Sequence, residues 1–494
     1  MRIEESGVSR WSRLDARLLL GLLAYACAVA FLQMGASPTA ELDQAEQLIL
    51  SQRLQWGYTN QPPLYTWLLW GIAQWTGPSL TVLLLFKVGL LLALAVSFVG
   101  IGHELRLSQR QRVLSLAGLA WLPAFVWEAQ RDLTHSMLAA TMASLMLWGS
   151  LWAVRRRTWW AYALPGAAAA GALLSKHNAV IFVVAVLLTL LSLPEWRRRL
   201  HLGGVLLAIA VLAGLCAPHG LWLLQHPEVL AQTTHKLIGA HDDAGWVAWG
   251  ELLVSLLKGL LAFLMPWLLV AVPLWWWARR QSAAQSLMTR LLWVVMAVLL
   301  VFVLAIGAES FKGRWLFPLL FFVPLWLAAS VDVGASRATQ VMVRGGVALA
   351  VLCGVLLPLR IVWPVAGEVQ TRQNLPLVGL GVQLQQAWGA VPPVVLVSHH
   401  HVGGNLRLAW GRVPLIQSPR MTWPVASPDE VMVVATDQDL RDPAFATWLR
   451  AQTNQAPGDL HWQTVHAPVL HRPQLPPYVL HWARVKRLPD GTHT

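Results

Sequence analysis

Acidic and basic side chains gather in the short polar segments that separate the long apolar stretches of this 494-residue chain. The first such segment, at 41–68, begins ELDQAE and so carries Glu41, Asp43 and Glu46 in its first six positions. Asp43 and Glu46 are three residues apart, so on a helix they share one face. The dipole of a helix favours an ionised carboxylate in the first turn. The segment therefore predicts a carboxylate that can take a proton from a hydroxyl group.

Four later polar segments hold further reactive groups. They contain Glu128, Arg131, Asp132 and His135, then Lys176 and His177, then His226, His235, Lys236, His241, Asp242 and Asp243, and finally Glu309, Lys312 and Arg314. Cations stabilise a phosphate leaving group as its charge develops, while a carboxylate base activates the attacking hydroxyl. Together these groups fit glycosyl transfer from a lipid phosphate. Taken one at a time, each residue also fits an ordinary solvated loop.

The elements that must position these groups are membrane-spanning helices. Hydrophobic residues make up 56% of the chain and charged residues only 12%, whereas about a quarter of the residues of a soluble protein are charged. Apolar runs near the length of about 20 residues that spans a bilayer recur along the first three quarters of the sequence. We predict about eleven spans, at 18–36, 80–102, 113–127, 134–153, 159–175, 179–194, 202–223, 251–277, 291–306, 315–331 and 345–362.

The distribution of positive charge predicts the topology. With a cytoplasmic N-terminus, the inner segments carry 18 Lys or Arg residues and the outer loops six, which matches the positive-inside rule. The first span follows three arginines and is expected to be a retained signal anchor. The net charge of +13 then reflects topology and not a nucleic-acid partner. All five polar segments lie on the outer side in this arrangement, so we expect an active site there.

The C-terminal part differs in composition from the rest. Residues 1–362 form the expected transmembrane domain with its reactive outer loops, and residues 363–494 a small extracytoplasmic α/β domain. The runs VPPVVLVSHHHVGG, GRVPLIQSP and DEVMVVATDQDL read as strands, with helical stretches near 377–389 and 441–452. The fold class is therefore an α-helical integral membrane protein with a C-terminal α/β domain.

Several other features leave alternatives open. Lys87 lies one to two helical turns inside its span, and fits either a lipid-phosphate ligand or an interfacial anchor. The three cysteines are far apart and predict no disulfide. A divalent metal ion is a possible cofactor, through the histidines at 399–401 or through His235, His241, Asp242 and Asp243. Neither group has a dedicated ligand spacing, and adjacent histidines on a strand would point to opposite faces.

The opening segment resembles a known family. Asp43, an amphipathic helix and then GYTNQPPLYTWL are similar to bacterial members of the dolichyl-phosphate-mannose protein mannosyltransferase superfamily, which include lipid A aminoarabinose transferases and related undecaprenyl-phosphate-sugar transferases. EAQRDLTHSML at 128–138 resembles the second acidic loop of that family. LLSKHNAVIF at 173–182 and FKGRWLFPL at 311–319 are similar to its Lys and Arg segments. The segment around LRLAWGRVPLIQSP resembles its periplasmic domain.

The resemblance implies a GT-C fold, a polyprenyl-phosphate-linked sugar as donor, and an inverting single displacement onto a lipid, glycan or protein acceptor. It also implies a bacterial inner membrane with the active site facing the periplasm. Asp43 would be the catalytic base and Asp132 a second acidic residue. The donor phosphate would be bound by Lys176 and Arg314, with Lys87 and Arg131 as further candidates. The acceptor or cavity residues would be Glu46, Tyr58, Gln61 and His177.

This sequence departs from the family pattern in two places. Gln44 stands where the family commonly has Glu, and Asn60 and Gln61 replace charged residues before the Pro pair. These changes leave open a non-catalytic binder of polyprenyl lipids. A transporter or flippase of a lipid-linked sugar is a second alternative, because it could also collect charged residues and tryptophans. A transporter is expected to have ionisable residues near the middle of the bilayer and paired repeats. The sequence names neither the sugar nor the acceptor.

Overall fold

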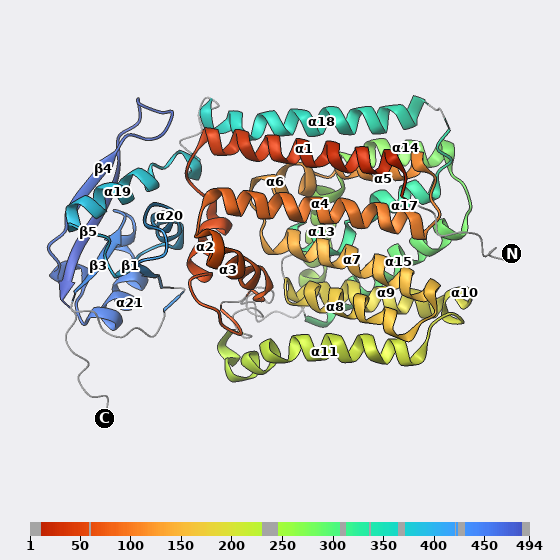
Figure 1. Ribbon diagram of the computed structural model, residues 1–494, viewed down its shortest axis with the longest axis horizontal. Coiled ribbons are helices and arrows are strands. Elements are labelled where there is room, and N and C mark those ends of the chain that lie inside the picture. The colour runs from red at the N-terminus through yellow and green to blue at the C-terminus, as the bar shows by residue number, and fades with distance from the viewer. Residues whose placement is uncertain are drawn as a thin grey trace. The chain divides into compact units, whose positions relative to one another are not determined.

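The computed structural model describes residues 11–58, 61–229, 246–306, 313–334, 337–363, 371–419, 421–422 and 430–486 (Figure 1). The chain forms two compact units, and it crosses from one to the other several times. The first unit comprises Met1–Cys27, Asn60–Leu64 and Lys87–Gly354. The second comprises Ala28–Thr59, Tyr65–Phe86 and Val355–Thr494. The C-terminal part therefore folds together with most of the first polar segment, although nearly 300 residues separate them in sequence.

Six helices of the described residues are long and apolar enough to span a membrane. They are α1 (Arg13–Ala36), α4 (Leu80–Glu104), α7 (His135–Arg156), α11 (Leu202–Gln225), α15 (Ala283–Ile306) and α18 (Arg337–Val362). Three bent pairs bring the count to nine if each pair is one span: α5 (Gln109–Leu119) with the π-helical η1 (Ala124–Glu128) and α6 (Ala129–Arg131), α13 (Trp246–Leu264) with α14 (Trp267–Ala278), and η4 (Gly313–Leu316) and α16 (Phe317–Leu320) with α17 (Val323–Ser330).

The predicted count of eleven spans is not confirmed. The two remaining predicted spans fall on α8 (Ala163–Leu173), preceded by η2 (Trp159–Tyr162), and on α9 (Val180–Ser192), preceded by η3 (His177–Ala179). Both helices are shorter than the roughly 20 residues that cross a bilayer. A shorter α10 (Pro194–Arg197) follows. The chain is nevertheless a multi-pass helical membrane protein, as its composition predicts.

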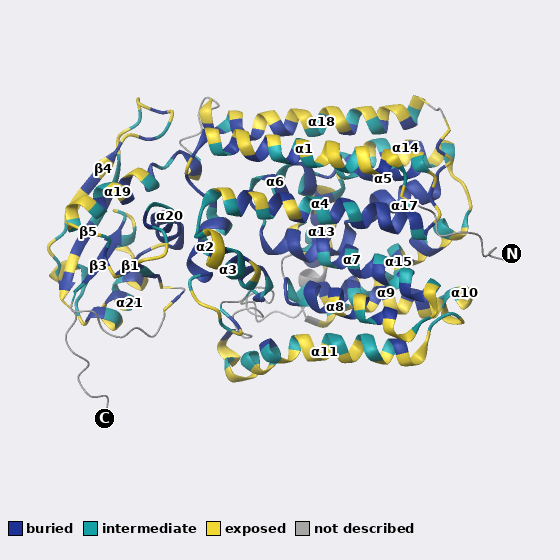
Figure 2. Ribbon diagram, in the orientation of Figure 1, coloured by how far each residue is buried: buried dark blue, intermediate teal, exposed yellow. Residues whose placement is uncertain are grey.

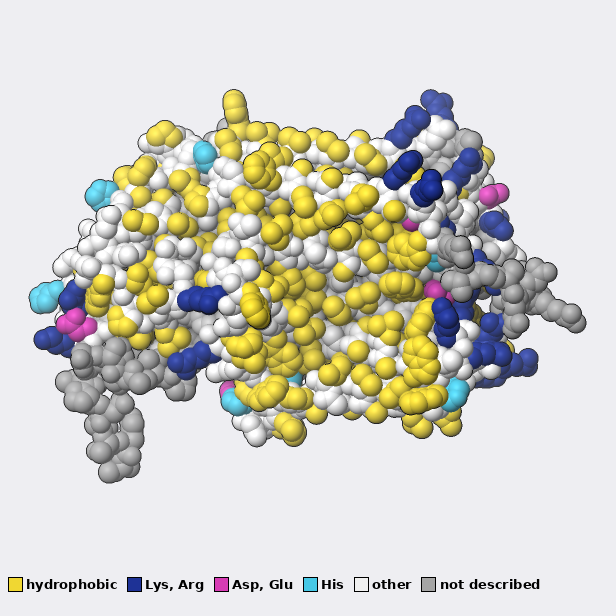
Figure 3. Space-filling model, in the orientation of Figure 1, with side chains coloured by type: hydrophobic (Ala, Val, Ile, Leu, Met, Phe, Trp, Pro, Cys, Tyr) yellow, Lys and Arg dark blue, Asp and Glu magenta, His cyan; other side chains and the backbone are white. Residues whose placement is uncertain are grey.

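Packing within the first unit separates buried helices from peripheral ones. In the most apolar stretch of α7, 72% of the residues are buried, against 11% in α11 (Figure 2). Small residues bring the helices close together: a Cβ on Gly166 of α8 would lie 2.5 Å from the carbonyl oxygen of Ala208 on α11. Figure 3 shows hydrophobic side chains along the flank of these helices and Lys and Arg side chains gathered beside the N-terminal residues. This gathering agrees with the charge bias found in the sequence.

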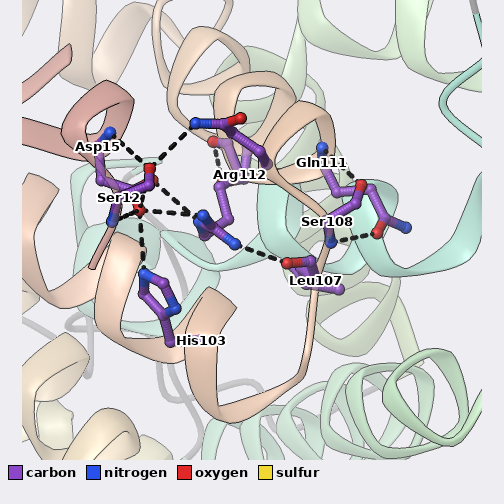
Figure 4. Close-up of polar contacts among 9 residues, drawn as sticks. Ser12, Asp15, His103, Leu107, Ser108, Gln111 and Arg112 are labelled. Atoms are coloured by element: carbon purple, nitrogen blue, oxygen red, sulfur yellow. Dashed lines mark hydrogen bonds and ion pairs between the residues drawn. The ribbon is translucent and has the colours of Figure 1, made fainter. Parts of the chain in front are cut away.

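The end of the first unit that carries the N-terminal residues is held by a buried polar cluster, which we call the Asp15 cluster (Figure 4). Both carboxylate oxygens of Asp15 on α1 accept hydrogen bonds from Arg112 on α5, at 3.0 and 2.9 Å. His103 on α4 lies 3.1 Å from the same carboxylate. Arg112 also donates to the carbonyl of Leu107 in the connection between α4 and α5. One fully buried carboxylate therefore joins three helices.

The C-terminal part of the second unit is an α/β fold, as predicted. Its five strands have the order β2-β1-β3-β5-β4, with β1 parallel to β2 and β3, and β5 antiparallel to β3 and β4. The strands are β1 (Val394–Val397), β2 (Leu415–Gln417), β3 (Glu430–Ala435), β4 (Gln463–Ala467) and β5 (Tyr478–Lys486). The helices are α19 (Leu377–Trp388), α20 (His400–Trp410) and α21 (Pro443–Thr453), with short turns η5 (Arg372–Asn374), η6 (Asp439–Arg441) and η7 (Pro457–Asp459).

Alternation along the strands assigns one core to each face of the sheet. Val395 and Val397 of β1 pack with residues of α19 and α20, whereas Val394 and Leu396 pack with Phe445 and other residues of α21. Such alternation follows from the two-residue period of a strand. The helices predicted near 377–389 and 441–452 correspond to α19 and α21. The prediction of the strands from the three valine-rich runs is likewise confirmed by β1, β2 and β3.

The three histidines at 399–401 do not lie on a strand, so that prediction is wrong. β1 ends at Val397, and His399 is the N-cap of α20, where its Nδ1 accepts from the backbone N–H of His401. The Nε2 of His401 lies 3.0 Å from the carbonyl oxygen of Ala40. In the described ranges, no group of three or more His, Cys, Asp or Glu side chains could hold a metal ion. His235, His241, Asp242 and Asp243 lie outside those ranges.

The Asp15 cluster gives a prediction on stability. Asp15→Ala leaves the Arg112 guanidinium buried without its carboxylate, and breaking a buried ion pair costs about 3 to 5 kcal/mol. We expect a much lower temperature of unfolding in detergent than for the wild type. Arg13→Ala, which removes an exposed charge from the same helix, is the control and should change little. Equal melting temperatures for the two variants would contradict this role of the cluster.

His401 gives a prediction on pH dependence. Burial lowers the pKa of His401 to about 4 from its ordinary value of 6.5, against the opposing effect of its hydrogen bond to Ala40. The neutral ring is thus the stable form in the folded protein, and only the unfolded chain takes up a proton just below pH 6.5. Stability should therefore fall as the pH drops from about 6.5 to about 4, by up to about 3 kcal/mol from this group.

The matched variant is His401→Gln, whose amide can still donate to Ala40 but does not titrate. Melting temperatures of both proteins in detergent, measured between pH 7.5 and 4, isolate the contribution of His401 because all other groups are shared. As the pH falls, the melting temperature of the wild type should decrease more than that of His401→Gln. Parallel curves over this range would show that His401 does not contribute.

Candidate functional site

The first acidic segment forms the short helix α2 (Leu42–Leu50), with Asp43 in its first turn as predicted. The helix ends at Leu50. Its N-cap is Glu41, whose backbone N–H donates to the side-chain oxygen of Gln44 at 3.2 Å in a capping box. Gln44 is thus a capping residue, and an amide oxygen there serves as well as the carboxylate that the family commonly has.

Asp43 and Glu46 are half exposed, whereas the residues between and after them on α2 are buried, including Gln44, Ala45 and Gln47. The two carboxylates therefore share one face, as their spacing predicts. That face lies at the N-terminal half of the helix, where the peptide dipoles favour negative charge. An ion pair also fixes the start of the helix: Arg360 of α18 donates to the carboxylate of Glu41 at 2.7 Å.

Helix α3 (Leu64–Thr76) supports the same segment within the second unit. The hydroxyl of Thr66 donates to the side chain of Gln47 at 2.7 Å, and the indole of Trp67 donates to the carbonyl of Gln55 at 2.6 Å. Tyr58 is a predicted cavity residue, but its hydroxyl donates to the carbonyl of Arg53 at 2.9 Å. Burial raises the pKa of Tyr58 to about 12. Its hydroxyl thus closes the loop that follows α2.

The remaining predicted residues lie in the first unit. Gln61 is half buried in the bend before α3. Three residues later, the N–H of Leu64 donates to the carbonyl of Leu174 at 2.9 Å. The Pro pair at 62–63 therefore leads the chain onto the C-terminal end of α8, in an extended entry of the kind that prolines favour.

Lys87 and the second acidic loop form one part of the first unit. The ammonium of Lys87 donates to the carbonyls of Gln130 and Arg131, both at 3.2 Å, and the side chain is only 5% exposed. It thereby satisfies carbonyl groups at the C-terminal end of α6. Arg131 itself pairs with Glu128 at 3.1 Å, with both side chains partly exposed. Lys87 therefore orders the loop that carries Asp132.

The loop at Asp132 has an unusual backbone. Asp132 is 8% exposed, and the next residue, Leu133, has a φ of +27°. Residues other than glycine rarely adopt a positive φ, and such conformations cost about 1 to 3 kcal/mol and gather at functional sites. The strained turn lies between α6 and the first turn of α7, and Asp132 is buried there. This observation favours a functional role for Asp132 over that of an ordinary solvated loop residue.

Lys176, one of the two predicted phosphate ligands, contacts the backbone of the other, Arg314. The ammonium of Lys176 donates to the hydroxyl of Ser136 at 2.8 Å and to the main-chain carbonyl of Arg314 at 3.1 Å. Asn178 also connects the η3 turn with the η4 turn, because its side chain donates to the carbonyl of Trp315 at 2.8 Å. The Arg314 side chain is exposed. Lys176 thus connects the start of α7 with the η4 turn that carries Arg314.

A row of stacked rings continues from this pair. His177 stacks on His219 of α11 at 5.8 Å between ring centroids, with an interplanar angle of 9°. His219 stacks on Trp222, and Trp222 on His226. The sequence analysis did not single out Ser136 or His219. His219 could have been identified from the sequence, because burying an ionisable side chain inside a membrane span costs free energy and usually indicates a function.

Comparison with solved structures defines the class of fold. The chain superposes on the crystal structure of ArnT from Cupriavidus metallidurans bound to undecaprenyl phosphate with a TM-score of 0.58 and 14% identity, over 96% of this chain and 99% of the other. The apo form of ArnT from the same organism gives a TM-score of 0.55 over 95% and 98%. The fold is therefore that of the GT-C glycosyltransferases.

Comparison of sequences agrees with the fold. The model of the dolichyl-phosphate-mannose-protein mannosyltransferase family matches residues 60–222. The lipopolysaccharide core galacturonosyltransferase RgtA of Rhizobium johnstonii is 29% identical over 80% of this chain and 81% of its own, and RgtB, of the same description and organism, is 28% identical over 85% and 86%. In fold and in sequence, the chain is therefore similar to the GT-C glycosyltransferases of the dolichyl-phosphate-mannose protein mannosyltransferase superfamily. The resemblance seen in the first polar segment is thereby confirmed.

Proposed function

We propose that the chain is an inner-membrane glycosyltransferase that moves a sugar from a polyprenyl phosphate to a hydroxyl group of a lipopolysaccharide acceptor at the periplasmic face. The observation that carries the proposal is the placement of Asp43 on α2. It is a half-exposed carboxylate in the first turn of a helix whose other side is buried. This is the environment of an ionised base that a hydroxyl group can approach.

The proposed reaction is a single displacement with inversion. The acceptor hydroxyl oxygen forms a bond to the anomeric carbon of the sugar, and its proton passes to the carboxylate of Asp43. The bond between the anomeric carbon and the phosphate oxygen breaks, and the polyprenyl phosphate leaves with the electron pair. Lys176 and Arg314 are assigned to stabilise the charge that develops on this phosphate. Asp132 is assigned as a second acidic residue that orients the substrate.

The relatives support the choice of donor and acceptor. ArnT was crystallised with undecaprenyl phosphate, which favours an undecaprenyl-phosphate-linked donor here. RgtA and RgtB are named as galacturonosyltransferases of the lipopolysaccharide core, and RgtD, 24% identical over 44% of this chain, as a lipid A galacturonosyltransferase. We therefore propose a hexuronic acid as the transferred sugar, and the core or lipid A region of lipopolysaccharide as the acceptor.

The experiment that tests the function is transfer by the purified full-length chain. It uses polyprenyl-phosphate-linked galacturonic acid as donor and lipopolysaccharide without galacturonic acid as acceptor. Wild type is compared with Asp43→Asn in the same detergent. We expect the variant to lose at least about 100-fold in rate, which is the usual contribution of a general base. Binding of undecaprenyl phosphate should remain.

The matched control is Asp459→Asn. Asp459 is an exposed carboxylate of the second unit that accepts a hydrogen bond from the N–H of Ala456 at 2.8 Å, which an Asn side chain can also accept. It should keep the wild-type rate. Full activity of Asp43→Asn would remove Asp43 from the mechanism. If wild type binds the donor or moves it between leaflets without transferring sugar, the transporter or lipid-binding alternative replaces the proposal.

A further inference from the structure

Helix α20 of the C-terminal part packs directly on α2, in the same compact unit. The closest approach is at Gly404, where an added Cβ would lie 2.2 Å from the carbonyl oxygen of Ala45 and 2.6 Å from its Cα. A Cβ on Gly403 would lie 2.9 Å from the side chain of Ile49. The two helix backbones are therefore in contact, and no other residue type fits at position 404 without moving one of them.

Polar contacts from α20 fix the N-terminal end of α2. The side chain of Asn405 accepts a hydrogen bond from the N–H of Ala40 at 2.7 Å and donates to the carbonyl of Ala40 at 3.3 Å. His401 also contacts this carbonyl at 3.0 Å. Ala40 directly precedes the N-cap residue Glu41, and Asn405 is fully buried. Both polar groups of one residue at the entrance to α2 are thus held by α20.

A cation from α20 holds the other end of α2. The guanidinium of Arg407 donates to the carbonyl of Leu48 in the last turn of α2 and to the hydroxyl of Ser51. A positive charge at this place complements the helix dipole and satisfies a carbonyl left without a helical partner. Just beyond, Gln52 exchanges two hydrogen bonds of 2.8 Å with the backbone of Ile416 at β2.

These contacts lie on the side of α2 opposite its partly exposed carboxylates. Successive residues of a helix are about 100° apart, so Asp43 points about 200° away from Ala45, the residue on which Gly404 packs. The nine residues of α2 are fewer than the roughly 12 to 15 at which an isolated helix becomes even marginally stable. The orientation of Asp43 therefore depends on what packs against the opposite side of α2.

We propose that α20 is the positioning element of the reaction, with Gly404, Asn405 and Arg407 as positioning residues that set the direction of the Asp43 carboxylate. None of the three touches the reacting atoms in this assignment. The inference rests on the proposed function of Asp43 as the base. It assigns a role in catalysis to the GGNLR sequence at 403–407.

The test compares two glycine substitutions in the purified full-length chain. Gly404→Ala inserts a methyl group into the backbone of α2, whereas Gly379→Ala in α19 adds the same group where nothing lies within 4 Å. We expect Gly404→Ala to lower kcat at least about 10-fold, because a displacement of about 1 Å can cost about 100-fold in rate. KM for the donor and binding of undecaprenyl phosphate should stay within about twofold of wild type, since the cations are untouched. Gly379→Ala should behave as wild type.

Amide hydrogen exchange over residues 42–50 gives a second readout that does not need activity. Exchange should be faster in Gly404→Ala than in wild type and unchanged in Gly379→Ala. If Gly404→Ala does not fold, Asn405→Ala tests the same contact between α20 and α2, because it removes hydrogen bonds without adding volume. Arg407→Met should lower kcat, and Arg407→Lys, which keeps the charge, should restore part of it.

The outcomes separate the inference from the function on which it rests. Faster exchange with an unchanged kcat would show that α20 only stabilises the fold, and would overturn the positioning role. Unchanged exchange of residues 42–50 in both Gly404→Ala and Asn405→Ala would show that α20 does not stabilise α2, and would overturn the inference. If wild type transfers no sugar, the proposed function fails, whereas the exchange data still decide whether α20 holds α2.

Discussion

A helix of nine residues is not stable by itself in water, because too few hydrogen bonds follow the costly first turn. Helix α2 has this length, and it carries the carboxylates Asp43 and Glu46 on the one face that is not buried. Its geometry therefore comes from tertiary contacts: the Glu41–Arg360 ion pair, the Thr66–Gln47 hydrogen bond and the helix α20. The placement of the candidate base depends on all of them.

Polar side chains satisfy main-chain carbonyls in both compact units. In the first unit, Lys87, Lys176 and Asn178 use their side chains to satisfy main-chain carbonyls where helices end or break. An unsatisfied carbonyl inside a membrane costs several kcal/mol, so these side chains order the loops as well as supplying charge. In the second unit, Asn405 and Arg407 bind the carbonyls of Ala40 and Leu48 in the same way, next to a sheet with one core on each face.

Much of the architecture could be predicted from the sequence because the signals are local. Apolar length identified the helices, and the spacing of Asp43 and Glu46 identified a shared face on α2. Valine-rich runs between Pro and Gly identified the first three strands. The count of eleven spans is not confirmed, because α8 and α9 are shorter than a bilayer crossing; nor did the sequence indicate bends such as the 72° break between α5 and the helices that follow it. Local periodicity does not report such a break, since its cause is the packing around it.

The contacts at the candidate site could not be predicted in this way, because they join residues that are far apart in sequence. Nothing near Lys87 in sequence shows that its ammonium binds the carbonyls of Gln130 and Arg131. The histidines at 399–401 suggested a metal on a strand, but tertiary contact with Ala40 and the start of α20 decide their environment. Motif likeness named the family and the reactive loops. It did not reveal that a glycine-rich turn of helix more than 350 residues later packs on the first of them.

The distance in sequence between α2 and α20 also sets an order of assembly. About 350 residues separate the end of α2 from the start of α20, and a ribosome adds about 5 to 20 residues each second. For roughly 20 to 70 s the segment that carries Asp43 is made but lacks the surface on which it folds. The spans are synthesised during that interval, so the reactive helix is completed only after the helices of the bundle. A chain interrupted at any point before residue 400 would therefore be a membrane protein without an ordered α2.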